Sequence, residues 1–100
     1  MKTFGDLIKL AREEKSLFLR QVAAELDIDQ AIISKFERGE RKPKKHQVLK
    51  FAQFYDIDQD NLIVAWLSDK LTYELKDENL ACEALKVADA KIKIVQKIKD

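Results

Sequence analysis

One short segment, residues 30–38, combines side chains that could read the edges of DNA base pairs. At about 100° per residue, a helix over this segment presents on one side Gln30, Ala31, Ser34, Lys35 and Arg38. Gln can bond an adenine edge through two hydrogen bonds, Lys can reach guanine O6 and N7, Ser can bond either base, and Ala suits a thymine methyl group. The apolar residues Ile32, Ile33 and Phe36 fall on the opposite side. We therefore expect one buried face and one face suited to a DNA groove.

A basic run follows this face. Residues 35–50 hold seven Lys or Arg against Glu37 and Glu40. Residues 1–50 carry twelve Lys or Arg and eight Asp or Glu, a net charge of +4. On charge alone, a solvated loop explains such a run as well as phosphate binding does. Beside a polar helix face, however, a positive patch matches the electrostatic footprint of a nucleic-acid-binding protein.

Two short predicted helices, residues 19–26 and 30–38, are separated by three to four residues, a spacing that suits a helix-turn-helix. Such helices cross steeply and need a small residue where they touch, which Ala23 supplies. The turn favours a residue that tolerates positive φ, and Asp27 is acceptable there. Ile28 follows as the buried apolar residue that the motif requires. The segment therefore meets the physical requirements of the motif.

Helical periodicity also runs through the rest of the chain, whereas hairpin turns and long β-branched alternations are absent. Thr3 can cap a first helix that ends near residue 14, with Asp6 favourable to its dipole. Asp29 can cap the helix from residue 30, and Gly39 can end it in a left-handed conformation. Further helices are predicted over residues 45–54, from 58 or 60 toward 75, and from a cap at Asp77 to about 97.

Residues 19–43, LRQVAAELDIDQAIISKFERGERKP, resemble the Cro and phage-repressor-like helix-turn-helix family, often called XRE-like. Residues 33–39 are especially similar to the end of that family's recognition helix. As a pattern, the resemblance covers about residues 4–67. It implies an all-α fold, with a five-helix repressor-like DNA-binding domain in residues 1–67. Residues 68–100 then form an additional C-terminal helical extension.

The resemblance also implies roles for individual residues. The helix from residue 30 would lie in the major groove, with base contacts from Gln30, Ala31, Ser34 and Lys35. Contacts to the DNA backbone would come from Arg20, Arg38, Arg41, Lys42, Lys44 and Lys45. Arg12 and Glu37 match positions that form a partly buried ion pair in many members.

Three residues depart from the family pattern. Phe18 stands where a Ser or Thr cap is usual, and Leu19 where a phosphate-binding Gln is common. Both changes remove polar groups, for which Arg20 could compensate. Asp27 replaces the usual Gly of the turn and brings a negative charge toward the DNA.

The predicted last helix carries more apolar surface than docking on a small domain requires. The surplus favours a symmetric dimer contact. The candidate interface residues are Leu71, Leu75, Leu85, Ala88, Ile92 and Val95. Packing against the rest of the same chain is the alternative.

Composition excludes several classes of protein. The chain is 46% hydrophobic and 37% charged with a net charge of only +1, so we expect it to fold. Its longest apolar run, residues 62–67, is far below the roughly 18 residues of a membrane span. The single cysteine cannot form an internal disulfide and no secretory signal is visible, so a cytoplasmic protein is expected. His46 is the only histidine and lacks partners for a metal site, and no catalytic constellation emerges, so no cofactor and no enzyme are expected.

These observations favour a dimeric transcriptional regulator that binds double-stranded operator DNA. The alternative is an antitoxin or adaptor whose C-terminal helices bind a partner protein. A plain helical bundle without DNA binding is the remaining possibility.

Overall fold

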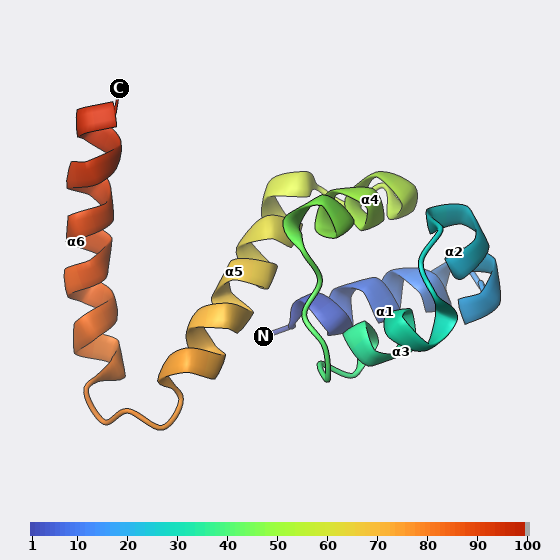
Figure 1. The fold of residues 1–100 in the computed structure, drawn as a ribbon, viewed down its shortest axis with the longest axis horizontal. Helices are drawn as coiled ribbons and strands as arrows, with labels where there is room; N and C mark the ends of the chain where they lie inside the picture. The colour runs from blue at the N-terminus through green and yellow to red at the C-terminus, as the bar shows by residue number, and fades with distance from the viewer. Residues whose placement is uncertain (100) are drawn as a thin grey trace. The chain divides into compact units, whose positions relative to one another are not determined.

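The structure is a computed structural model that describes residues 1–99, and the regular secondary structure of these residues consists of helices alone. Its helices are α1 (Phe4–Glu14), α2 (Leu19–Leu26), α3 (Gln30–Glu37), α4 (Lys45–Tyr55), α5 (Gln59–Leu75) and α6 (Ala81–Lys99) (Figure 1). The all-α fold class is therefore confirmed. The chain divides into two compact units, one ending at Lys70 and one starting at Leu71, and α5 crosses this division. The boundary predicted after residue 67 falls within α5 and stays a prediction.

The start of α1 is built by the predicted capping residues. The Thr3 hydroxyl accepts a hydrogen bond from the Asp6 backbone N–H at 3.0 Å, and the Asp6 carboxylate accepts one from the Thr3 N–H at 3.1 Å. This reciprocal arrangement satisfies two backbone donors at the helix terminus. The bond from the Thr3 backbone also lowers the pKa of Asp6 below its ordinary value.

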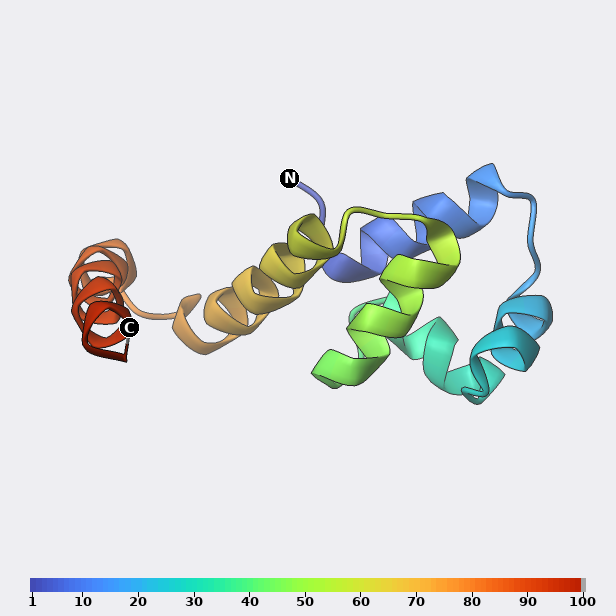
Figure 2. The ribbon, with the colours of Figure 1, turned by 90° about the horizontal axis from the view of Figure 1, so that it is seen from above.

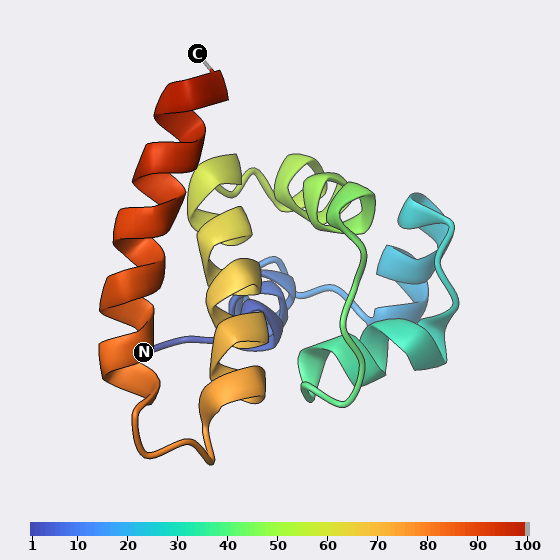
Figure 3. The ribbon, with the colours of Figure 1, turned by 60° about the vertical axis from the view of Figure 1, so that its left-hand side comes forward.

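The turn between α2 and α3 has the predicted geometry (Figure 3). Asp27 takes a left-handed conformation with φ 54°, and Ile28 behind it is buried. The Asp29 carboxylate then caps α3 by accepting hydrogen bonds from the backbone N–H groups of Ala31 and Ile32, at 2.8 and 3.4 Å. Gly39, with φ 74°, follows the end of α3 as expected. Each of these local predictions is confirmed.

The core of the first unit lies where α1 and α2 both pack against α3 and α4 (Figure 2). Phe51 of α4 is fully buried in this core. The rings of Phe4 and Phe36 meet it edge-on, with centroids 5.8 and 6.2 Å away, and Tyr55 stacks on it at 6.1 Å. Aromatic pairs at such distances add packing energy beyond the area that they bury.

The helix predicted over roughly residues 45–54 is confirmed to within one residue: α4 ends at Tyr55, and Asp56 after it takes a left-handed conformation with φ 56°. One predicted helix boundary was wrong. The last helix begins at Ala81 and not after a cap at Asp77. The backbone N–H of Glu78 bonds back to the Leu75 carbonyl oxygen at 2.9 Å, so the residues around Asp77 close the end of α5 in a turn and do not open α6.

Candidate nucleic-acid interface

The outward side of α3 is an exposed strip of mixed chemistry, here called the α3 face: Gln30, Ala31, Ser34 and Lys35. Ser34 is half-buried, and the other three side chains are exposed. Ile33 and Phe36 are buried in the core on the other side of the helix, and they fix the rotation of α3 about its own axis. The structure thus brings together four of the five residues that the sequence placed on one face.

Arg38, at the end of α3, is engaged by its neighbours. Its guanidinium bonds to the Glu40 carboxylate at 2.8 and 3.0 Å, and its Nη1 donates to the Ser34 hydroxyl. The hydrogen bond from Arg38 lowers the pKa of Glu40 and raises that of Arg38. Glu40 therefore offsets the positive charge of Arg38 at the edge of the α3 face, which the basic run in the sequence did not indicate.

An ion pair beneath α3 joins it to α1. Arg12 Nε and Nη2 donate to the two carboxylate oxygens of Glu37 at 2.8 and 3.0 Å. The third nitrogen, Nη1, donates to the Leu17 carbonyl oxygen at 3.0 Å. Glu37 is buried, and the hydrogen bond to it raises the pKa of Arg12. Because the contact is bidentate, it fixes the orientation of α3 as well as its distance from α1.

A backbone contact that the sequence analysis missed also sets the distance between α1 and α3. Gly5 is buried against the end of α3, and a Cβ atom at this position would meet the carbonyl oxygens of Phe36 and Glu37, the latter at 2.7 Å. Only a residue without a side chain allows this approach. The usual sequence signals of glycine, a turn or a helix end, give no indication of such a role in the first turn of a helix.

The basic loop between α3 and α4 is anchored at Pro43. Its basic residues Arg41, Lys42 and Lys44 are exposed, and so is Lys45 at the first position of α4. Pro43 between them is buried, and its carbonyl oxygen accepts a hydrogen bond of 2.9 Å from the indole N–H of Trp66 in α5. The sequence alone did not indicate this bond. No short-range signal links residues 23 positions apart.

The start of α2 lacks a side-chain cap, as the departure at Phe18 implies. The Phe18 ring is 59% exposed, and the Arg20 guanidinium lies over it with Cζ 4.5 Å from the ring centroid. The Gln21 side chain accepts a hydrogen bond from the Phe18 backbone N–H at 2.7 Å. Stacking on the ring restrains Arg20, the one basic side chain of α2, at the exposed start of this helix.

The predicted dimer residues lie in the second unit or at its edge. Leu71, Ile92 and Val95 are 51–53% exposed, Leu85 is 38% exposed, and Leu75 and Ala88 are half-buried. No residue between Ala81 and Lys99 is buried. The larger apolar side chains of α6 are therefore exposed among the described residues.

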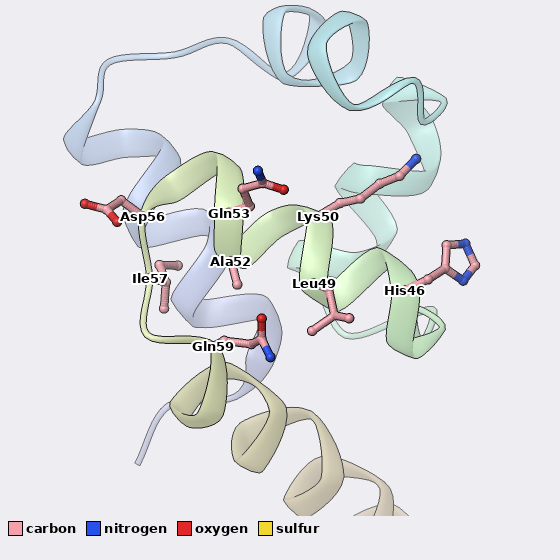
Figure 4. A pocket seen from close by; sticks show the side chains of 8 residues that line it. All are labelled: His46, Leu49, Lys50, Ala52, Gln53, Asp56, Ile57 and Gln59. Atoms are coloured by element: carbon pink, nitrogen blue, oxygen red, sulfur yellow. The ribbon is translucent and has the colours of Figure 1, made fainter.

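A pocket of about 560 Å³ runs along α4 to the start of α5, with His46 and Asp56 at its two ends (Figure 4). Its polar side chains are spread along the helix and do not converge on one point. Within residues 1–99, no group of three or more His, Cys, Asp or Glu could hold a metal ion. Across the same residues, no helix is long and apolar enough to span a membrane.

Comparison with known proteins identifies the family of most of the chain. A family model described as a helix-turn-helix domain matches residues 5–71, which include α2, the turn and α3. No curated protein and no solved structure matches the chain significantly. The matched region also contains the basic loop and Trp66.

Proposed function

This chain belongs to the helix-turn-helix domain family, and on that premise we propose that it is a sequence-specific, DNA-binding transcriptional regulator of the Cro-like type. The observation that carries the proposal is the exposed α3 face beside an exposed basic loop that is anchored to the core. A helix of this motif enters the major groove, while flanking basic side chains neutralise phosphates.

Base recognition is assigned to the α3 face. Gln30 lies at the first position of α3 and Lys35 one and a half turns later, so their side chains would reach different base pairs. Gln suits the adenine edge, and Lys suits guanine O6 and N7. Ser34 would contribute after releasing its hydrogen bond from Arg38. Ala31 leaves room for a thymine methyl group.

Contacts to the DNA backbone are assigned to Arg20, Arg38, Arg41, Lys42, Lys44 and Lys45. Within this set, Arg20 is held over Phe18, and Arg38 would have to share its guanidinium between Glu40 and a phosphate. Each phosphate that is neutralised releases counterions, so affinity should fall steeply with salt. A net charge of +1 for the whole chain does not oppose this, because the positive side chains are concentrated beside α3.

Selection of binding sites from random duplex DNA, followed by mobility-shift titration, tests the proposal. The selected duplex should bind roughly a thousandfold or more tighter than a scrambled duplex of equal length at the same salt concentration. Equal affinities would leave only non-specific DNA binding. No shift at low salt would remove the proposal altogether.

We further propose that the regulator acts as a homodimer through Leu71, Leu75, Leu85, Ala88, Ile92 and Val95. The open apolar side of α6 supports this part of the proposal. A two-fold dimer would place two α3 helices on half-sites about 34 Å apart, one turn of DNA. The same patch on each copy would serve both sides of the contact.

Light scattering at micromolar concentration tests the dimer with a matched pair of variants. Leu85→Asp places a charge in the proposed contact and should reduce the mass to that of a monomer. Ile94→Asp makes the same kind of change on the other side of α6, where Ile94 is 61% exposed, and should leave the dimer intact. A monomeric wild-type protein would favour the second candidate function, an antitoxin or adaptor whose C-terminal helices bind a different protein.

A further inference from the structure

The open side of α6 has a regular pattern that defines a contact seam. Its apolar residues alternate at spacings of four and three: Ala81, Leu85, Ala88, Ile92 and Val95. This is the repeat by which two helices pack side by side along a shared seam. None of these five residues is buried among the described residues of the chain. Ala81 and Ala88 are half-buried, and Leu85, Ile92 and Val95 are exposed, so the larger apolar side chains of the seam are not covered.

We propose that this seam pairs with the same seam of a second copy in antiparallel orientation, across a two-fold axis at the level of Ala90. The inference rests on the proposed dimer and adds the direction and register of its helices. Two independent features of α6 favour antiparallel over parallel pairing: the distribution of its charges and the sizes of its seam residues.

Charge is segregated along this part of the chain. Residues 81–89 of α6 contain the acidic Glu83 and Asp89 and one basic residue, Lys86, whereas residues 91–99 contain four Lys and no acidic residue. Antiparallel pairing sets the acidic half of each helix beside the basic half of its partner, whereas parallel pairing sets like beside like. The helix dipole accounts only for charges in the first and last turns. The helix dipole therefore does not explain why Asp89 and Lys91 stand near the middle of α6.

The sizes of the side chains in the seam give the second argument for antiparallel pairing. With the axis at the level of Ala90, Leu85 faces the partner's Val95, and Ala88 faces the partner's Ile92. Each of these layers joins a larger residue with a smaller one, so the helices keep an even separation. In parallel pairing every residue faces its own copy, and narrow Ala88 layers would alternate with wide Ile92 layers. Even layers fill space without voids, which favours the antiparallel arrangement.

The antiparallel pairing also brings residues of like charge close to each other near the two-fold axis, which by itself is unfavourable. Asp89 lies near the partner's Asp89 on one flank of the seam. Lys93 already pairs with Asp89 at 2.9 Å within its own helix, so two carboxylates and two ammonium groups meet there. On the other flank Lys91 approaches its own copy, but its long side chain can turn the ammonium group into solvent. Neither flank therefore opposes the antiparallel pairing strongly.

The lone cysteine allows the orientation to be measured in the full-length chain. Cys82 is exposed near the start of α6 and lies on the same flank of the seam as Gln96. In the antiparallel dimer, the two Cys82 residues are sixteen helical positions apart, about 24 Å along the axis. Cys82 instead lies within one helical turn of the partner's Gln96. In a parallel dimer, the two Cys82 residues would lie at the same level, facing each other across the seam.

Reaction with a short bis-maleimide linker, read on a denaturing gel, distinguishes these arrangements. We expect the wild type to remain at the monomer band and Gln96→Cys to shift to the dimer band. A Cys82→Ser/Gln96→Cys variant, whose single cysteines would lie far apart, should return to the monomer band. Light scattering of each protein before the reaction shows whether the copies associate.

Each other result overturns the inference in a different way. A dimer whose wild type cross-links through Cys82 has parallel helices. A dimer in which neither protein cross-links is held by another surface or in another register. A monomer by light scattering removes the proposed homodimer as well, while the mobility shift with selected DNA still tests DNA binding separately.

Discussion

The indole N–H of Trp66 in α5 donates a buried hydrogen bond of 2.9 Å to the carbonyl oxygen of Pro43 in the basic loop. Pro43 is itself buried, whereas the basic residues on either side of it are exposed. The bond therefore holds the centre of the loop against the core and leaves its charges in solvent. Since loops are otherwise the least restrained segments of a fold, this contact sets where those charges lie.

Replacing Trp66 by Phe should destabilise the protein and weaken DNA binding uniformly. The substitution leaves the buried Pro43 carbonyl without a donor, which costs about 1–3 kcal/mol in unfolding free energy. A looser loop should lower affinity for specific and scrambled DNA alike. Urea denaturation and salt-dependent titrations measure the two effects. Lys70→Met is the control, because Lys70 Nζ lies 3.6 Å from the Trp66 ring centroid; if it reproduces the loss, the ring contact and not the hydrogen bond is responsible.

Removing either partner of the Arg12–Glu37 pair should destabilise the protein strongly. Arg12→Ala leaves the Glu37 carboxylate buried and uncompensated, and breaking such a pair costs about 3–5 kcal/mol. Because both single variants lose the same interaction, a double-mutant cycle by urea denaturation should show clear coupling. The exposed Arg38–Glu40 pair is the matched control and should show coupling near the error of the method. Equal coupling in the two cycles would contradict the role assigned to burial.

Tyr55→Phe should stabilise the protein. The Tyr55 hydroxyl is buried and finds no hydrogen-bond partner among the described residues. An unpartnered buried hydroxyl costs about 1–3 kcal/mol, which the substitution would recover. Tyr73→Phe, at a residue that is 63% exposed, should leave the midpoint of urea denaturation unchanged. A lower midpoint for Tyr55→Phe would mean that the hydroxyl is satisfied in solution.

The same residue should make stability depend on alkaline pH. Burial raises the pKa of Tyr55 above its ordinary value of 10.0, so the folded state holds the proton after the unfolded state has released it. The contribution of the neutral phenol is therefore complete below pH about 10 and is lost as the pH rises further. Denaturation midpoints measured between pH 8 and pH 11 should fall more for the wild type than for Tyr55→Phe.

Substitutions in the α3 face and in the basic loop should affect DNA binding differently. Gln30→Ala and Lys35→Ala should each relax base preference at one or two positions, at about 1–3 kcal/mol. Arg41→Ala and Lys44→Ala should weaken all sequences about equally and reduce the salt slope by about one per phosphate contact. Repeated site selection with each variant measures the preference. Unchanged preferences in Gln30→Ala and Lys35→Ala would mean that α3 is not the helix in the groove.

Local signals in the sequence determined where the first helices begin and end. Thr3, Asp29 and Gly39 act on backbone groups within four residues, so residue type and spacing were enough to predict these ends. The same reasoning failed at Asp77, because a good capping residue is also a good turn residue and the chain used it in a turn. Helical periodicity likewise placed Gln30 and Lys35 on one outward side, since the buried Ile33 and Phe36 leave only one orientation of α3.

Only the tertiary structure decided which contacts hold the basic loop and the neighbouring helices around the α3 face. Gly5 touches the end of α3, Trp66 bonds Pro43, and the Tyr55 hydroxyl is left without a partner. Periodicity shows which side of a helix is buried, but it does not show which atoms meet that side, because this depends on how helices distant in sequence cross. A hydrogen bond between residues 23 positions apart leaves no local pattern, so the anchoring of the basic loop became visible only in the fold.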